Sequence, residues 1–309
     1  MSIARTLLLK ASDSAWLREN ATKAPFVRRA VSRFMPGESF DDMIVAARTM
    51  AAEGVTALCT RLGENVKDLA EADGVARHYL EGIARIHTLN LACEPSLKLT
   101  QLGLDIDREL AYGHLRDLGA RAHAAGNYLW IDMEQSHYVD ITLDLTRRLR
   151  SEFPRVGVCL QAYLYRTRED LVELMARGVG IRLVKGAYNE PAEVAFPKKS
   201  DVDANYYALA QLMLAAGSRA SGARAVFGTH DAQLIDSIRR HAAATGVTPA
   251  EFEIHMLYGI QKATQLRLAR DGASVRVLIA YGAYWFPWYM RRLAERPANV
   301  WFVAKSLFG

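Results

Sequence analysis

From residue 55 onwards, the chain alternates short apolar runs with longer amphipathic segments. The apolar runs fall at 55–59, 91–99, 128–134, 156–163, 181–188, 225–231, 252–258 and 275–281. Segments between them, such as 139–150, 167–176 and 203–216, have the spacing of helices that bury one face. Strands that alternate with helices favour parallel βαβ units, and this number of units fits an α/β (βα)8 TIM barrel. A doubly wound open sheet is the alternative fold.

The first 53 residues lack this alternation and have helical patterns throughout. Ser39 begins a segment with the residue types of a helix N-terminus, and this helix is expected to run to about Ala52 before Gly54 ends it. The sequence therefore predicts two parts, an N-terminal helical arm over residues 1–53 and a barrel domain over residues 54–309.

The net charge and the cysteine content indicate which binding partners and which cellular compartment to expect. The formal net charge is +5, and Lys and Arg are spread along the chain, so we expect no nucleic-acid partner. A mildly basic surface still favours anionic ligands or an anionic membrane surface. The cysteines, Cys59, Cys93 and Cys159, lie far apart in apolar runs, as expected of reduced thiols in the cytoplasm. We find no signal-peptide pattern and no apolar stretch approaching the roughly 18 to 20 residues of a spanning helix.

Polar residues recur where the apolar runs end, which in a barrel is the face that carries active sites. They are Lys98, Asp132, Glu134, Gln161, Lys185, Thr229, His230, Asp231 and His255. Their repetition from run to run predicts a ring of polar groups around one cavity. Lys98 and Asp132 follow neighbouring runs, so each is the natural partner for the charge of the other.

Two pairs of cations are unusual in their surroundings. Arg182 and Lys185 lie in and just after a buried strand, where a cation is costly unless an anion meets it. Arg291 and Arg292 lie beside several aromatic residues, and paired guanidinium groups can bind a carboxylate in bidentate fashion. The Rossmann, Walker A and nucleophile-elbow patterns are absent. No HExxH pattern or close pair of histidines is present, so we expect no metal site.

Six short motifs occur in order with barrel-like spacing. They are Ile-Asp-Met-Glu at 131–134, Leu-Gln-Ala-Tyr at 160–163, Arg-Leu-Val-Lys-Gly-Ala-Tyr at 182–188, Gly-Thr-His-Asp at 228–231, Met-Leu-Tyr-Gly at 256–259 and Met-Arg-Arg-Leu-Ala-Glu-Arg at 290–296. Together they resemble the proline dehydrogenase family, in its short monofunctional bacterial form. The resemblance implies a distorted (βα)8 barrel with FAD at its C-terminal face and the last helix over the barrel mouth.

The resemblance also implies roles for individual residues. Lys98 and Asp132 are expected to form a cation–anion pair beside the substrate. The remaining substrate contacts would come from Tyr188 and Leu257 around the ring, and from Arg291 and Arg292 on the carboxylate, with Glu295 orienting an arginine. The flavin contacts would come from Gln161, Arg182, Val184, Lys185, Gly186, Ala187, Thr229 and His230. Glu64 is expected to pair with Arg291 and close the site.

Leu278 departs from the family pattern. The family usually has Tyr-x-Pro-Tyr-Gly on the last strand, where this chain has Leu278-Ile279-Ala280-Tyr281-Gly282. The family tyrosine lies against the substrate ring and helps to exclude ring substituents. A leucine is smaller and donates no hydrogen bond, so we expect weaker discrimination against 4-substituted prolines.

The sequence therefore predicts an FAD-dependent enzyme that oxidises L-proline to 1-pyrroline-5-carboxylate by hydride transfer and passes the electrons to a quinone. Two alternatives remain open: a dehydrogenase of hydroxyproline or another modified proline, and a barrel that binds a flavin or an amino acid without catalysis. The expected location is the cytoplasm, with peripheral association at the inner face of the membrane as a further hypothesis.

Overall fold

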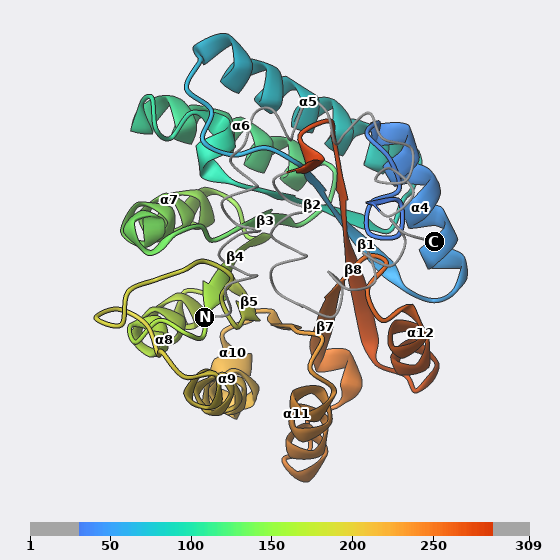
Figure 1. Ribbon diagram of the computed structural model, residues 1–309, viewed down its shortest axis with the longest axis vertical. Helices are drawn as coiled ribbons and strands as arrows, with labels where there is room; N and C mark the ends of the chain where they lie inside the picture. Colours follow the sequence, from blue (N-terminus) through green and yellow to red (C-terminus); the bar gives the residue numbers. More distant parts are fainter. Residues whose placement is uncertain (1–30, 287–309) are drawn as a thin grey trace, which may run out of the picture.

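Parallel strands form a closed barrel in the computed structural model, which describes residues 31–286 (Figure 1). The strands pair in sequence order, and β8 closes the barrel by pairing with β1. Their bounds are β1 (Thr56–Arg61), β2 (Cys93–Leu97), β3 (Leu129–Ile131), β4 (Val156–Gln161), β5 (Gly180–Val184), β6 (Ala225–Gly228), β7 (Phe252–Leu257) and β8 (Ser274–Tyr281). The predicted (βα)8 barrel is confirmed, and the closed sheet excludes the doubly wound alternative.

Helices surround the barrel and connect successive strands (Figure 1). The described α-helices are α4 (Phe40–Ala52), α5 (Leu69–Thr88), α6 (Arg108–Ala124), α7 (Val139–Glu152), α8 (Thr167–Ala176), α9 (Lys199–Leu214), α10 (Ala216–Ala220), α11 (Ala232–Ala244) and α12 (Lys262–Arg270). Short 3-10 helices are η1 (Leu99–Leu102), η2 (Ser136–Tyr138) and η3 (Pro249–Glu251). Within residues 31–286, none of these helices is both long and apolar enough to span a bilayer.

Helix α4 has the bounds expected from its capping residues. The Ser39 side chain accepts a hydrogen bond from the Asp42 backbone, and the Asp42 carboxylate accepts one from the Ser39 backbone. The helix packs against β1 and β8, and the Phe40 and Tyr281 rings meet edge to face with centroids 5.5 Å apart. The domain division at residue 53 stays a prediction. Most of the expected N-terminal arm and the last helix lie outside the described residues.

Four charged side chains form a closed ring inside the barrel near the N-terminal ends of the strands. Arg224, just before β6, contacts Glu94 on β2 at 3.0 Å and Glu253 on β7 at 2.5 Å. Arg276 on β8 contacts the same two carboxylates at 3.2 and 2.6 Å. Because β2 and β6 are not neighbours in the sheet, these bonds cross the barrel interior. We call these four residues the interior charge ring; its formal charges cancel.

Trp130 on β3 lies above the interior charge ring and is fully buried. Its Nε1 donates a hydrogen bond to Glu94 at 2.7 Å. The guanidinium groups of Arg224 and Arg182 each lie 5.3 Å from its ring centroid, within the range of cation–π attraction. The neighbouring position on β4 is Gly157, and a Cβ there would overlap the Trp130 ring. A small residue on β4 therefore makes room for a large aromatic ring in the barrel interior.

His255 lies within β7 and bonds to the interior charge ring, so its expected position at the strand end is wrong. Its Nε2 is 3.2 Å from Glu253 Oε2, and its side chain is buried. Burial lowers the pKa of His255 to about 3, against a partial opposing effect of Glu253. Burial alone would raise the pKa of Glu253, but hydrogen bonds from His255 and Arg224 hold it well below its usual range.

We predict that His255 makes the protein sensitive to mild acid. The pKa of this histidine is 6.5 in the unfolded chain and about 3 in the fold. The neutral side chain therefore contributes stability above pH 6.5, and this contribution is lost as the pH falls towards 3. Between about pH 7 and about pH 5, the wild type should lose about 2 kcal/mol more unfolding free energy than His255→Gln. Urea unfolding at both pH values measures this difference, and equal losses would contradict the neutral, buried state of His255.

Candidate active site

Arg182 and Asp132 form an ion pair at the C-terminal side of the barrel interior. Arg182 on β5 is 5% exposed, and its Nη2 bonds to the Asp132 carboxylate, which follows β3. Ser96 on β2 completes a triangle, because its Oγ accepts from Arg182 at 3.0 Å and donates to Asp132 at 2.9 Å. Burial alone would lower the pKa of Arg182, but the Asp132 carboxylate raises it above its ordinary value. The buried cation at this strand end therefore has its anion within the chain.

Lys98 pairs with Glu64 and not with Asp132, so the expected Lys98–Asp132 pair is wrong. Lys98 Nζ donates to Glu64 Oε2 at 2.8 Å, and both side chains are largely shielded from solvent. The physical reason is that Arg182 reaches across the barrel interior to Asp132, while Glu64 approaches Lys98 from the loop after the neighbouring strand β1. The expected partner of Glu64, Arg291, lies outside the described residues.

Gln161, at the end of β4, has one hydrogen bond and one buried acceptor. Its Nε2 donates to the backbone oxygen of Glu134 at 3.1 Å. Its Oε1 is buried and has no hydrogen-bond partner within residues 31–286. The Glu134 carboxylate is held by Thr100, and burial raises the pKa of this acid. Gln161 therefore presents an acceptor that a ligand N–H group could satisfy.

The loop after β5 carries Lys185, Gly186 and Ala187. Lys185 Nζ lies 2.5 Å from Asp203 and 2.7 Å from Asp231, and these contacts hold the pKa of both carboxyls below the usual range, against the opposing effect of burial. Gly186 has φ of +114°, and a Cβ there would overlap the Tyr163 ring. Glycine is therefore required by the fold of this loop as well as by any ligand beside it.

Glu190 holds the same loop against two neighbouring loops, a role that sequence reasoning missed. Its carboxylate accepts from the Ser136 backbone N–H at 2.8 Å and from Ser136 Oγ at 2.5 Å. The Tyr163 hydroxyl lies 3.4 Å from the same group. Glu190 thus joins the loops that follow β3, β4 and β5. The signal in the sequence is its position two residues after the Arg-Leu-Val-Lys-Gly-Ala-Tyr motif.

The remaining predicted residues fall into four groups. Thr229 and His230 follow β6, and His230 Nε2 accepts from the Leu257 backbone N–H at 2.9 Å. Leu257 and Leu278 are register partners on β7 and β8, and Leu278 packs against Leu58, Trp130 and Val226 in the interior. Val184 ends β5, and Tyr188 is half-buried in the next loop. Arg291, Arg292 and Glu295 lie outside the described residues.

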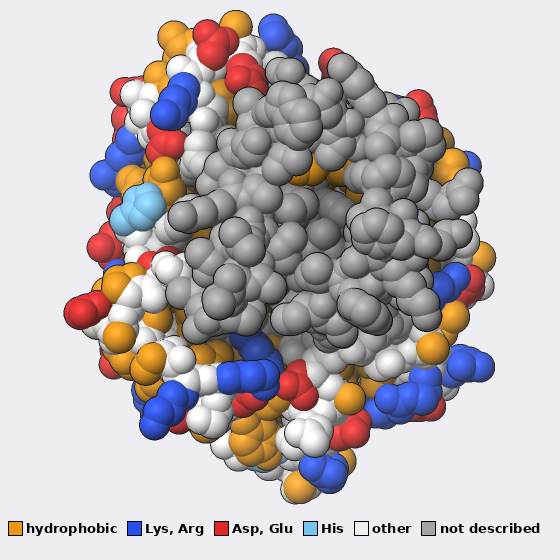
Figure 2. Space-filling view, viewed as in Figure 1, with side chains coloured by type: hydrophobic (Ala, Val, Ile, Leu, Met, Phe, Trp, Pro, Cys, Tyr) orange, Lys and Arg blue, Asp and Glu red, His pale blue; other side chains and the backbone are white. Residues whose placement is uncertain are grey.

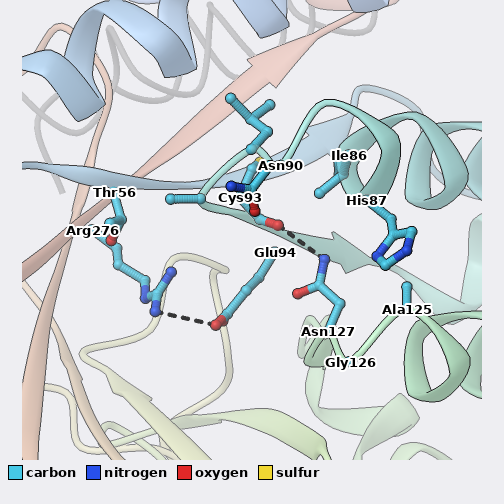
Figure 3. A pocket seen from close by; sticks show the side chains of 12 residues that line it. Thr56, Ile86, His87, Asn90, Cys93, Glu94, Ala125, Gly126, Asn127 and Arg276 are labelled. Carbon is cyan, nitrogen blue, oxygen red and sulfur yellow. Dashed lines mark hydrogen bonds and ion pairs between the residues drawn. The ribbon is translucent and has the colours of Figure 1, made fainter.

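Two of the hollows formed by the described residues lie at opposite ends of the barrel strands. One, of about 260 Å³, opens at the N-terminal ends of β1 to β3, and its polar groups already bond to one another, as Arg276 does to Glu94 and Asn127 to the Cys93 carbonyl (Figure 3). The other, of about 520 Å³, lies among the loops after β1, β2 and β3. On the face seen in Figure 2, acidic and basic side chains are interspersed around the rim rather than separated into patches.

Comparison with known proteins decides the family. The proline dehydrogenase family model matches residues 43–305. The chain is 36% identical over 307 residues to proline dehydrogenase 2 of Bacillus subtilis subsp. natto, with 99% of both chains covered. The chain belongs to the proline dehydrogenase family. It is also 37% identical over 280 residues to proline dehydrogenase of Deinococcus radiodurans, with 89% of each chain covered.

Solved structures agree on the fold of this proline dehydrogenase family member. Proline utilization A of Bdellovibrio bacteriovorus, inactivated by N-propargylglycine, has a TM-score of 0.82 at 22% identity, covering 95% of this chain and 36% of that one. Proline utilization A of Corynebacterium freiburgense has a TM-score of 0.75 at 21% identity, and the match covers 99% of this chain and 35% of that one. The resemblance to the proline dehydrogenase family drawn from the motifs is confirmed. The chain is an oxidoreductase of a flavin-dependent family, while the roles of single residues stay predictions.

We predict that Asp132→Ala strongly destabilises this family member, because Arg182 would be left as a buried charge without its carboxylate. The loss should be about 3 to 5 kcal/mol of unfolding free energy. The matched control is Asp144→Ala, which breaks an ion pair with Arg108 whose side chains are 42% and 50% exposed and should cost at most about 1 kcal/mol. Urea unfolding of the flavin-saturated proteins measures both, and similar losses would show that the Arg182–Asp132 pair adds little.

Proposed function

We propose that this chain oxidises L-proline to 1-pyrroline-5-carboxylate with FAD and passes the electrons to a quinone. The observation that carries the proposal is the near full-length similarity to curated proline dehydrogenases, joined to a polar, charged site at the C-terminal ends of the barrel strands. In barrels of this kind, catalytic groups gather at that face. A barrel without catalysis is disfavoured because such a lining of paired charges is costly to maintain.

The residues at the mouth fit a flavin. Gln161 offers a buried acceptor without a partner within residues 31–286, which suits the ring N–H of an isoalloxazine. Arg182 and Lys185 place positive charge on β5 and its following loop, which suits a ring that gains negative charge on reduction. When bound, the flavin supplies the two-electron acceptor for the hydride that leaves proline C5. Val184, Gly186, Ala187, Thr229 and His230 would complete the cofactor contacts.

On the substrate side, the chain would hold proline by its charged groups and its ring. Lys98 and Asp132 would flank the substrate from the ends of β2 and β3, each already oriented by a second partner. Tyr188 and Leu257 would exclude water from the ring, and Arg291 and Arg292 would bind the carboxylate, with Glu295 orienting one of them. A quinone acceptor would bring the protein to the inner surface of a membrane as a peripheral partner.

Leu278 supports a second candidate, a dehydrogenase that also accepts 4-hydroxyproline or another modified proline. Leu278 and Leu257 are register partners, so a residue that replaces the family tyrosine adjoins a predicted substrate contact. Leucine fills less volume than tyrosine and donates no hydrogen bond, so the wall offers less steric resistance to a ring substituent.

We predict that both L-proline and trans-4-hydroxy-L-proline bleach the flavin spectrum in anaerobic titration. Leu278→Tyr should raise the preference for proline by about tenfold, measured as the ratio of second-order rate constants for flavin reduction. Unfolding temperature of the holoenzyme serves as the control for a misfolded variant. Bleaching by neither compound would refute the proposed function. If the wild type already excludes hydroxyproline as strongly as the variant, the role of Leu278 is wrong.

A further inference from the structure

The hollow of about 520 Å³ is formed by three successive loops at the C-terminal ends of the first strands. These loops lead into α5, α6 and α7, which lie side by side in Figure 1. The lining residues are Asn65, Lys67, Asp105, Gln135, His137 and Tyr138. Its volume falls in the usual range for small-molecule sites, roughly 300 to 1,000 Å³.

The hollow adjoins the proposed substrate side of the barrel mouth. Asn65 directly follows Glu64, which is paired with Lys98. Gln135 lies in the same short segment as Asp132 and Glu134, whose backbone oxygen accepts a hydrogen bond from Gln161. The loops that hold the charged mouth groups therefore also form the walls of this hollow, and a ligand there would lie beside the catalytic site and not at the opposite end of the barrel.

The lining offers flat surfaces, donors and acceptors together. The His137 and Tyr138 rings have centroids 4.1 Å apart, and the Tyr138 hydroxyl donates to Asp105 at 2.7 Å. Burial and the neighbouring Asp105 raise the pKa of Tyr138, so its hydroxyl stays protonated. Gln135 Oε1 is buried without a hydrogen-bond partner in the described part of the chain. Lys67 and Asn65 add side-chain N–H groups to the same lining.

These groups match a ligand that arrives as a hydrogen-bond acceptor and leaves as a donor. The carbonyl oxygens of an oxidised quinone need donors, which Lys67, Asn65 and His137 carry. The hydroxyls of the reduced quinol need acceptors, which Gln135 and Asp105 carry. In the hollow at the other end of the barrel, Arg276 and Asn127 are bonded to Glu94 and to the Cys93 carbonyl.

We propose that this hollow binds the head ring of the quinone that removes electrons from the enzyme, an inference that rests on the proposed function. In the step it serves, the quinone takes two electrons from the reduced flavin and two protons from the flavin and solvent. Its two carbonyl oxygens become hydroxyls, its ring becomes aromatic, and the flavin returns to the oxidised form. Proline is not consumed in this step, so it can be followed separately from proline oxidation.

The test compares the wild-type holoenzyme with His137→Ala, since His137 is exposed and its removal spares the core. Binding of 2,3-dimethoxy-5-methyl-1,4-benzoquinone to the oxidised holoenzyme is measured by calorimetry, without turnover. We expect His137→Ala to raise the Kd about tenfold. In anaerobic stopped flow, the quinone concentration that gives half-maximal flavin reoxidation should rise by the same factor. The rate of flavin reduction by proline is recorded as the internal reference.

His87→Ala is the matched control, because His87 is an exposed histidine that lines the hollow at the opposite end. It should leave quinone binding and both half-reactions unchanged. Equal Kd values for wild type and His137→Ala, or quinone binding that excludes proline competitively, would overturn the proposed site. Failure of proline to reduce the flavin would instead refute the proposed function, while the calorimetric comparison would still decide whether the hollow binds a quinone.

Discussion

The barrel depends on a closed circuit of buried charge. The circuit joins Glu94 on β2, Arg224 just before β6, Glu253 on β7 and Arg276 on β8. Every member bonds to two others. Removing any one of them would leave one buried charge of the ring uncompensated, although each remaining side chain would keep one partner. A slip of one residue in β7 would turn Glu253 towards the helices. The circuit therefore discriminates between strand registers more than it adds net stability.

The interior charge ring also constrains the residues at the C-terminal ends of the strands, where the site lies. Trp130 bonds to Glu94 below and lies beside the guanidinium group of Arg182 above, so the position of Arg182 is linked to the interior charge ring through one rigid aromatic side chain. Gly157 allows that ring to fit. Arg182 then fixes Asp132, with Ser96 as the third member. The site is thus held by packed strand residues rather than by loops alone, which favours precise geometry at the reacting groups.

The sequence sufficed for the barrel because the alternation of strands and helices is a local pattern. The bounds of α8 at Thr167–Ala176 and of α4 at Phe40–Ala52 follow from spacing and capping residues. Ion pairing was harder to predict, because a barrel interior brings together residues from strands that are not neighbours. The sequence favours Lys98, on the adjacent run, as the partner of Asp132, yet Arg182 reaches Asp132 across the interior. Glu190 was missed for the same reason, since its partner Ser136 lies 54 residues away.

The pairing pattern also explains how a site can hold several cations and remain ready for anionic ligands. Three described cations at the mouth already have carboxylates: Arg182 has Asp132, Lys98 has Glu64, and Lys185 has Asp203 and Asp231. A guanidinium carries five N–H donors and an ammonium three, so one carboxylate does not exhaust either group. The carboxylates offset part of the cost of burying these charges and fix the side chains in one orientation. A ligand can then be met by the remaining donors without paying for their ordering.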